Sequence, residues 1–293
     1  MPFNFEIPQK KLGLIAGGGT LPYQVIKHCL EIGRPFFVIG LEGQALPNLM
    51  DQNIPHIWCR LGALGLMVET LKYEKVEDVV LIGSVKRPSF LDLRPDFYTT
   101  KLLVRLGTKA WGDDALLSFL IKELEAQGFS VCGIDDILPK DDLLLPPGLL
   151  GVHRPSEDMW KDIRRGLDIV RLLGEADVGQ AVILDQGLCL GVEAIEGTDA
   201  LIKRCADLRS DRLMFKGPSG ILIKMSKPGQ ELRADLPTLG LNTLKNLKTF
   251  GFKGVVGEAH KTLLVNREDC LAFADANDLF VLGIEAVTKG EYL

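Results

Sequence analysis

Short apolar runs alternate with helix-like segments through the first 140 residues, and few folds accommodate that order. The apolar runs are KLGLIAG (11–17), PFFVIGL (35–41), HIWCRLG (56–62) and VEDVVLIGSV (76–85). Runs of this length predict buried strands, and the segments between them, such as the one that begins at Leu21, have helical spacing. Alternating strands and helices form a parallel sheet with helices on both faces. We therefore expect an α/β domain over residues 1–140.

The end of this region predicts one more helix and strand before the pattern breaks. In GDDALLSFLIKELEAQGFSV (112–131), the inward positions of the helix are Leu116, Leu120, Ile121 and Leu124. Residues 138–150 then hold three prolines and a glycine, which interrupt regular structure. We take residues 141–150 as a linker between two domains.

The second half, residues 151–293, mixes hairpin and helix signals. Helices are expected after Ser156, after Thr198, near 241–250 and after Asn266. Strands are expected at 180–184, 188–195, 220–225, 254–258, 261–265 and 279–284, the first two joined by a turn at 185–187. This order predicts a C-terminal α+β domain.

Charge and composition exclude several classes of protein. Lys plus Arg number 34 and Asp plus Glu 39, a formal charge of -5, whereas nucleic-acid binding depends on clustered cations. No apolar run approaches the roughly 18 residues of a transmembrane helix, and the N-terminus lacks a signal-peptide pattern. The six cysteines are widely scattered, which is typical of reduced thiols in the cytoplasm. We expect a cytoplasmic protein without a nucleic-acid partner.

A glycine-rich loop, Gly17 to Pro22, follows the first expected strand and opens the first helix. Glycines there allow a phosphate to approach the free N–H groups of a helix N-terminus. The loop lacks the third glycine of a dinucleotide-binding fingerprint, since Pro22 occupies that position, and no G-K-[ST] follows. We favour nucleotide binding, with Glu42 as a candidate ribose ligand. The alternative is a tight turn that holds no ligand.

Two further segments are expected at the same edge of the sheet. Gly83, Ser84 and Val85 follow a buried strand, and Asp113 opens a helix. Ligands of open α/β sheets bind beyond the carboxyl ends of the strands, which favours a ligand site at Gly83–Val85. Asp113 is equally consistent with a helix cap.

The second half carries a denser set of polar residues. Glu193, Glu196 and Asp199 surround one turn, and the irregular segment from Lys224 to Thr238 mixes cations with acids. Carboxylates are ligands of Mg²⁺, and Lys or Arg can stabilise charge that develops on phosphoryl oxygens. A solvated loop is the alternative. The four histidines are isolated, and no G-x-S-x-G elbow is present, so any hydrolysis would rely on Asp or Glu, Lys and Mg²⁺.

Seven segments together resemble one family. They are LGLIAGGGTLP (12–22), GSVKRP (83–88), GDDALL (112–117), VEAIEGTDA (192–200), KPGQELRADLPTLG (227–240), GVVGEA (254–259) and LFVLGI (279–284). In this order, and across nearly the whole chain, they resemble the UDP-2,3-diacylglucosamine pyrophosphatases of the LpxI type, which act in lipid A synthesis.

The resemblance implies a Rossmann-like N-terminal domain for the UDP moiety and a distinctive C-terminal domain. It also implies Mg²⁺-assisted attack of water on the α-phosphorus, which yields UMP and 2,3-diacylglucosamine 1-phosphate. The key aspartate of its DLPT motif corresponds to Asp235. We expect the substrate to be a lipid-linked UDP-sugar. We also expect transient contact with the inner membrane and a homodimer.

Combining the resemblance with the residue patterns gives a set of candidate site residues. Catalytic candidates are Asp235, Lys227 and Arg233, and candidate ligands of Mg²⁺ are Asp235, Glu193 and Glu196. Candidate substrate-binding residues are Gly18, Gly19, Thr20, Leu21, Gly83, Ser84, Val85, Asp113, Gln180, Thr198, Asp199, Lys224 and Thr238. The competing functions are an NAD(P)-dependent oxidoreductase and a UDP-sugar-binding protein without catalytic activity.

Overall fold

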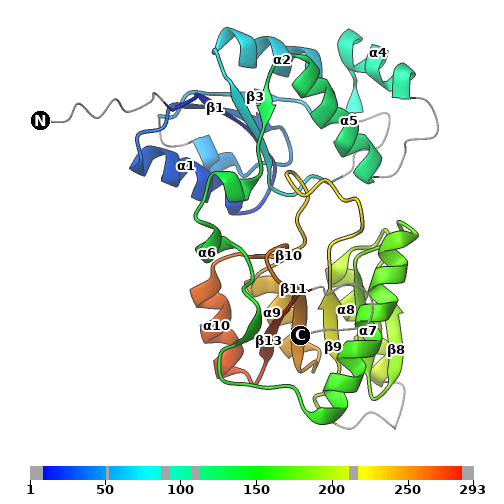
Figure 1. Ribbon diagram of the computed structural model, residues 1–293. Coiled ribbons are helices and arrows are strands. Elements are labelled where there is room, and N and C mark those ends of the chain that lie inside the picture. The colour runs from blue at the N-terminus through cyan, green and yellow to red at the C-terminus, as the bar shows by residue number, and fades with distance from the viewer. Residues whose placement is uncertain (1–8, 51–52, 87–92, 107–112, 211–216, 286–293) are drawn as a thin grey trace, which may run out of the picture. The chain divides into compact units, whose positions relative to one another are not determined.

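The chain divides into two compact units, Met1–Leu138 and Pro139–Leu293 (Figure 1). The computed structural model describes residues 9–50, 53–86, 93–106, 113–210 and 217–285. Each unit has its own sheet and its own buried side chains.

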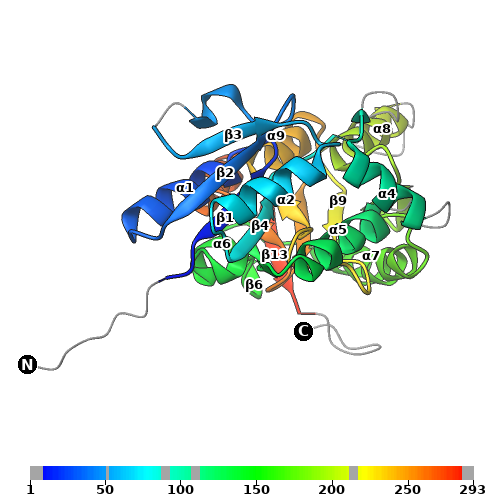
Figure 2. The same ribbon diagram turned by 90° about the horizontal axis from the view of Figure 1, so that it is seen from above.

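Unit 1 is built on a five-stranded parallel sheet in the order β3-β2-β1-β4-β5. Its strands are β1 (Leu12–Ala16), β2 (Phe36–Leu41), β3 (His56–Cys59), β4 (Asp78–Ile82) and β5 (Ser130–Val131). Figure 2 shows β3, β2, β1 and β4 side by side. The expected parallel sheet is confirmed. Because the strand order reverses at β1, the carboxyl ends of β1 and β4 flank the crevice where such sheets bind ligands.

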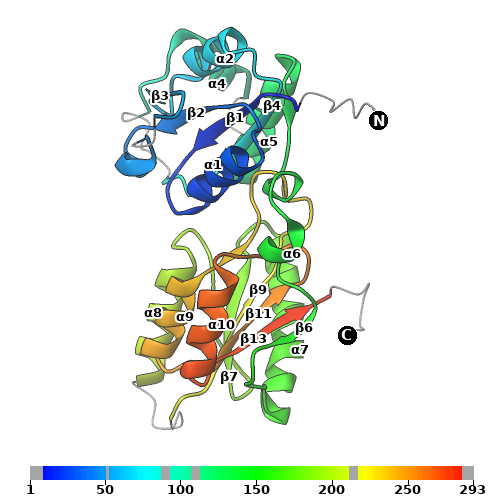
Figure 3. The same cartoon turned by 90° about the vertical axis from the view of Figure 1, so that its left-hand side faces the viewer.

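Helices cover both faces of this sheet, and Figure 3 shows α1 and α2 on opposite sides of it. The helices are α1 (Leu21–Glu31), α2 (Leu64–Tyr73), α4 (Phe97–Leu106) and α5 (Asp113–Ala126), with 3₁₀ turns η1 (Pro47–Met50) and η2 (Ile134–Asp136). On α5, Ile121 and Leu124 are fully buried as expected. Leu116 is 40% exposed, so its expected inward position is wrong, because burial on α5 increases only toward its C-terminal half.

Unit 2 contains a six-stranded mixed sheet in the order β6-β13-β11-β9-β7-β8. Its strands are β6 (Gly148–Leu150), β7 (Ala181–Asp185), β8 (Leu188–Val192), β9 (Ile221–Lys224), β11 (Gly254–Glu258) and β13 (Phe280–Ile284). Strands β9, β11 and β13 are parallel, and the outer three are antiparallel to their neighbours. The strand expected at 261–265 is shorter, since β12 (Leu263–Leu264) pairs with β10 (Thr238–Leu239) in a separate small sheet.

The sheet of unit 2 lies between two helical layers, as Figure 3 shows. Helix α7 (Glu157–Glu175) packs on one face, and α8 (Thr198–Ser210), α9 (Leu241–Thr249) and α10 (Arg267–Ala276) pack on the other. Successive side chains of a strand point to opposite faces of the sheet. On β9, Ile223 therefore packs in the core on the α7 side and Leu222 in the core on the other side. The expected helix cap is confirmed, because the side chain of Ser156 accepts a hydrogen bond from the Met159 N–H.

Residues 141–150, expected to form a linker, are an integral part of unit 2. They include most of α6 (Lys140–Leu143) and the whole of β6, which pairs with β13 in antiparallel register. Leu145 is fully buried. Two prolines are tolerated here because they precede an edge strand, where a missing N–H breaks no ladder. The division between the domains is close to the expected one, since unit 2 begins at Pro139, but residues 141–150 belong to that unit and do not form a linker.

Candidate functional site

One edge of the unit 2 sheet gathers most of the polar residues selected from the sequence. Parallel strands β9 and β11 end there at Lys224 and Glu258. The antiparallel strands reverse the direction, so β7 begins at this edge and β8 ends there, just before Glu193. The ends of β9, β11 and β8 and the start of β7 therefore lie together at this edge, so side chains from four strands can meet there.

Lys224, Thr198 and Glu193 form a hydrogen-bonded chain at this edge. The Nζ atom of Lys224 donates to Thr198 Oγ1 at 3.0 Å and to the Thr238 carbonyl at 3.4 Å. The Thr198 hydroxyl donates to Glu193 Oε1 at 2.7 Å. Because an ammonium only donates and a carboxylate only accepts, the direction of the threonine hydroxyl is fixed. Thr198 thus couples the cation to the carboxylate.

The electrostatics of this chain are those of a buried site. Burial lowers the pKa of Lys224 below its ordinary value, and the carboxylates of Glu193, Asp235 and Asp199 oppose that shift. Glu193 is 6% exposed, and its Oε2 atom is buried with no hydrogen-bond partner among the described residues. A buried acceptor of this kind calls for a donor from a ligand or a water molecule.

The segment from Ser226 to Pro237 brings Asp235 to the same edge. Gln230 Nε2 donates to Asp235 Oδ2 at 2.7 Å, and Gln230 Oε1 accepts from the Lys227 N–H at 2.8 Å. At the start of the segment, the backbone N–H of Ser226 donates to Glu258 Oε2 at 3.1 Å. Glu258 is buried and also pairs with Lys261. Glu258 therefore anchors the loop that carries Asp235.

Sequence reasoning did not select Gln230 or Glu258 as site residues. Glu258 ends the buried strand in GVVGEA, and a carboxylate at the end of such a strand was a usable signal. Gln230 had no comparable signal, because its partner lies five residues away in a segment without regular periodicity.

Other predicted residues have partners of their own. Lys227 Nζ lies 2.8 Å from Asp177 Oδ1, and Arg233 pairs with Glu231 at 2.8 Å. Both expected transition-state cations thus have carboxylate partners in the structure.

Two further predicted substrate-binding residues, Asp199 and Gln180, belong to unit 2. Asp199 accepts a hydrogen bond from Asn246 at 2.9 Å, and it also acts electrostatically on Lys224. Gln180 Oε1 is buried without a hydrogen-bond partner among the described residues.

The three candidate Mg²⁺ ligands do not form one closed metal site. The described part of the chain contains no group of three or more His, Cys, Asp or Glu side chains arranged to hold a metal ion. Glu196 pairs with Arg204 at 2.7 Å, and Glu193 binds Thr198. A magnesium ion usually takes one or two carboxylates and completes its shell with water and substrate phosphate. Asp235 could act as such a single carboxylate ligand. Glu193, Glu196 and Asp235 do not together surround a metal ion.

The glycine loop and the segment after β4 hold each other in unit 1. The Gly18 N–H donates to the Ser84 carbonyl at 2.8 Å, and the Ser84 N–H donates back to Gly18 at 3.0 Å. The Gly17 N–H is bonded to Ile82. These N–H groups are therefore not available to a phosphate. The backbone donors to consider are Gly19, Thr20 and Leu21 at the start of α1, where Thr20 makes no side-chain cap.

The remaining candidates of unit 1 lie near this pair of loops or outside the described side chains. Val85 is 45% exposed beside Ser84. Asp113 begins α5, but its side chain lies outside the described part of the structure.

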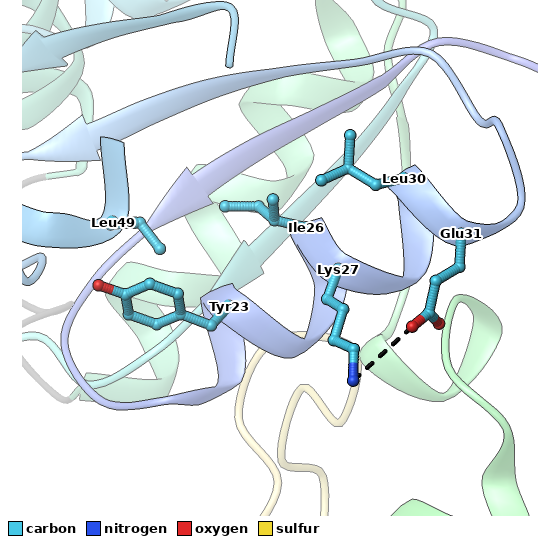
Figure 4. A pocket seen from close by; sticks show the side chains of 6 residues that line it. All are labelled: Tyr23, Ile26, Lys27, Leu30, Glu31 and Leu49. Atoms are coloured by element: carbon cyan, nitrogen blue, oxygen red, sulfur yellow. Dashed lines mark ion pairs between the residues drawn. The ribbon is translucent and has the colours of Figure 1, made fainter. Parts of the chain in front are cut away.

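A hollow of about 230 Å³ is lined by residues of α1 and η1 (Figure 4). Its lining consists of Tyr23, Ile26, Lys27, Leu30, Glu31 and Leu49. None of the residues selected from the sequence lines it. Among the described residues, every helix is too short or too polar to cross a bilayer.

Comparison with known proteins covers almost the whole chain. Residues 11–140 match the family model of the LpxI N-terminal domain, and residues 146–282 match that of the LpxI C-terminal domain. A similar protein is the UDP-2,3-diacylglucosamine pyrophosphatase LpxI of Caulobacter vibrioides. The two sequences are 40% identical over 283 residues, which is 94% of this chain and 98% of that protein.

Proposed function

Because this chain belongs to the LpxI family, we propose that it is a UDP-2,3-diacylglucosamine pyrophosphatase of lipid A synthesis. The observation that carries the proposal is the 40% identity over nearly the full length of both proteins. The reaction would cleave the pyrophosphate bond of a lipid-linked UDP-sugar into UMP and 2,3-diacylglucosamine 1-phosphate. The buried Lys224 and the Asp235 loop supply the kinds of groups that this hydrolysis needs.

In this proposal, the paired loops of unit 1 bind the uridine diphosphate moiety. The backbone N–H groups of Gly19, Thr20 and Leu21 suit an anionic phosphate, because they lie at the positive end of the α1 dipole. The segment Gly83–Val85 shapes the other side of the crevice between β1 and β4.

The groups of unit 2 perform the chemistry. The Asp235 carboxylate orients the attacking water and accepts its proton as oxygen approaches the α-phosphorus. The Lys224 ammonium, held by Thr198, donates to a phosphoryl oxygen whose negative charge grows in the transition state. Lys227 and Arg233 lie farther along the same segment, and we assign them a supporting role at the rim of the site.

We include Mg²⁺ in the proposal as a cofactor held by Asp235 and the phosphate oxygens of the substrate. A bound magnesium ion would neutralise phosphate charge and make the phosphorus more electrophilic. Chelation with EDTA should then abolish UMP release, and added Mg²⁺ should restore it. Activity that is unchanged by chelation would remove the metal from the proposal.

The experiment that tests the function is hydrolysis of UDP-2,3-diacylglucosamine by purified protein in ¹⁸O-labelled water. Label in UMP would establish attack on the α-phosphorus. Label in the sugar phosphate would preserve the activity but contradict the proposed site of attack. A protein that binds the UDP-sugar and releases no UMP would be the non-catalytic alternative.

We also propose a cytoplasmic protein that contacts the inner membrane transiently, because its substrate is an amphiphile, and a homodimer in solution. Flotation with liposomes and sedimentation equilibrium would test these two points separately. A monomer at micromolar concentration would contradict the homodimer.

A further inference from the structure

Gln230 is the one buried residue in the segment Ser226–Leu236, whose other residues are half-buried or exposed. It is 7% exposed, although a glutamine on an irregular segment is usually in contact with solvent. A buried amide must have partners for both of its ends, since an unmade hydrogen bond there costs roughly 1–3 kcal/mol. The contacts of Gln230 therefore identify what its burial achieves.

Both ends of the Gln230 amide are engaged, and their order is fixed. A backbone N–H can only donate, so the atom 2.8 Å from the Lys227 nitrogen must be the carbonyl oxygen Oε1. The amide nitrogen Nε2 then faces Asp235 and donates to Oδ2 at 2.7 Å. The backbone N–H of Gln230 also donates to the Lys227 carbonyl at 3.1 Å, which closes a tight turn around the side chain. The contacts with Lys227 thus fix the orientation of the amide that donates to Asp235.

We propose that Gln230 is a positioning residue that holds the Asp235 carboxylate in its reactive orientation. This inference rests on the function proposed above. The donated hydrogen bond fixes one carboxylate oxygen, which restricts rotation of the group and directs the other oxygen. A misplacement of about 1 Å in a reacting group can lower a rate by about 100-fold. A restraint on the position of the Asp235 carboxylate can therefore increase the rate. Gln230 thus acts through Asp235 and is assigned no chemical step of its own.

Three variants separate positioning from a general effect on the loop. Gln230→Ala removes both contacts, and Gln230→Glu keeps the shape and the acceptor for Lys227 but replaces the donor with a carboxylate that repels Asp235. Gln127→Ala is the matched control, since Gln127 likewise donates to a carboxylate, that of Glu123 at 3.1 Å, and belongs to unit 1. We expect kcat to fall about 10- to 100-fold in both Gln230 variants with KM within about threefold of wild type. Gln127→Ala should keep the wild-type kcat.

A double-mutant cycle with Asp235→Ala gives the decisive measurement. If Gln230 acts through Asp235, adding Gln230→Ala to Asp235→Ala should leave the residual kcat unchanged within about twofold. A further drop equal to that of the single variant would overturn the inference, as would a Gln230→Glu protein with wild-type kcat. A wild-type protein that releases no UMP would instead overturn the proposed function. Circular dichroism and thermal unfolding of each variant confirm that the proteins compared are folded.

Discussion

At the residue scale, the surroundings of Lys224 alter its acid–base chemistry. It lies almost wholly out of water, and burial lowers its pKa despite three neighbouring carboxylates. Desolvation disfavours the charged form of a lysine, so the proton is lost at a lower pH than from an exposed lysine. The proposed contact with a phosphoryl oxygen requires that proton. Activity should therefore decrease as the pH rises through the lowered pKa.

We predict that the alkaline limb of the kcat–pH profile begins below pH 10.5 and moves upward in Lys224→Arg. A guanidinium stays protonated to above about pH 12, so the variant should lose activity at neutral pH but keep a flat profile at high pH. The measurement is kcat from pH 6 to 10 in both proteins. The same alkaline limb in Lys224→Arg would show that another group titrates.

We predict that Asp235→Ala lowers kcat by at least about 1,000-fold and leaves the fold intact, because the side chain is only half-buried. Binding of the UDP-sugar should persist, since the carboxylate acts mainly in the transition state. Steady-state kinetics together with calorimetric titration check both statements. Asp158→Ala on the exposed face of α7 is the control. Near wild-type turnover with saturating Mg²⁺ would remove Asp235 from its catalytic role.

At the scale of elements, the two loops of unit 1 are held by glycines that permit close approach. A Cβ atom on Gly83 would lie 2.5 Å from the Gly18 carbonyl oxygen, and Gly83 has a φ of +96°. Both features disfavour any other residue there. The pairing of Gly18 with Ser84 thus sets the shape of the proposed phosphate crevice.

We predict that Gly83→Ala weakens binding of UDP by about tenfold or more, because backbone strain of about 1–3 kcal/mol is relieved only when the loops separate. Gly33→Ala is a matched control: Gly33 has a φ of +68°, but a Cβ atom there meets nothing within 4 Å. The control should cost stability and leave UDP affinity unchanged. Calorimetric titration of UDP into both variants makes the comparison. Equal affinities would contradict the role of the loop pair.

Strand β7 and helix α8 are joined at their other ends by a buried ion pair. Arg209 Nε lies 2.8 Å from Asp185 Oδ2, with side chains 8% and 1% exposed, and Ser219 bonds to both. The guanidinium also lies 5.0 Å from the centre of the Phe252 ring. These contacts lie at the opposite ends of β7 and α8 from Ala181 and Thr198. They therefore support the fold rather than the site.

We predict that Arg209→Met lowers the free energy of unfolding by about 3–5 kcal/mol, since Asp185 is left buried without its cation. Urea denaturation provides the measurement. Because the pair is remote from Lys224, kcat at 20 °C should remain within about twofold of wild type. A stability change below about 1 kcal/mol would mean that water enters and solvates Asp185.

At the scale of the whole molecule, the two units hold separate cores. Unit 2 has apolar clusters on both faces of its sheet, and each unit is within the usual size range of an independent domain. We predict that residues 139–293 fold alone, with one cooperative unfolding transition and a stability of about 5–15 kcal/mol. Circular dichroism during urea denaturation would show it. A non-cooperative transition would mean that unit 2 depends on residues before Pro139.

The stability of this fragment depends on where it begins, because residues 141–150 belong to unit 2 and are not a linker. A fragment that begins at residue 151 would lack β6, which pairs with β13, and would lack the buried Leu145. We expect it to be less stable than 139–293. The prolines that suggested a boundary in the sequence are compatible with an edge strand, and only the pairing distinguishes the two cases.

The sequence by itself determined most of the elements of this protein. Buried strands such as Leu12–Ala16 and Phe280–Ile284 are short apolar runs, and α7 combines helical periodicity with a cap at Ser156. These signals are local, because burial on one or both faces dictates residue type at fixed spacing. The family motifs also pointed to Asp235 and Thr198, and the mixed-charge segment pointed to Lys224, although their roles still require the experiments above.

Only the tertiary structure decided which polar residues meet. Lys224, Glu193 and Thr198 come from β9, the end of β8 and the start of α8, and the reversed direction of β7 and β8 brings them to one edge. Lys227 and Arg233 carry the same charge as Lys224, yet they pair with Asp177 and Glu231. Gln230 reaches Asp235 because the turn at 227–230 folds its side chain inward. Charge is encoded residue by residue, whereas hydrogen bonds depend on strand order and direction, which are set by packing of the whole sheet.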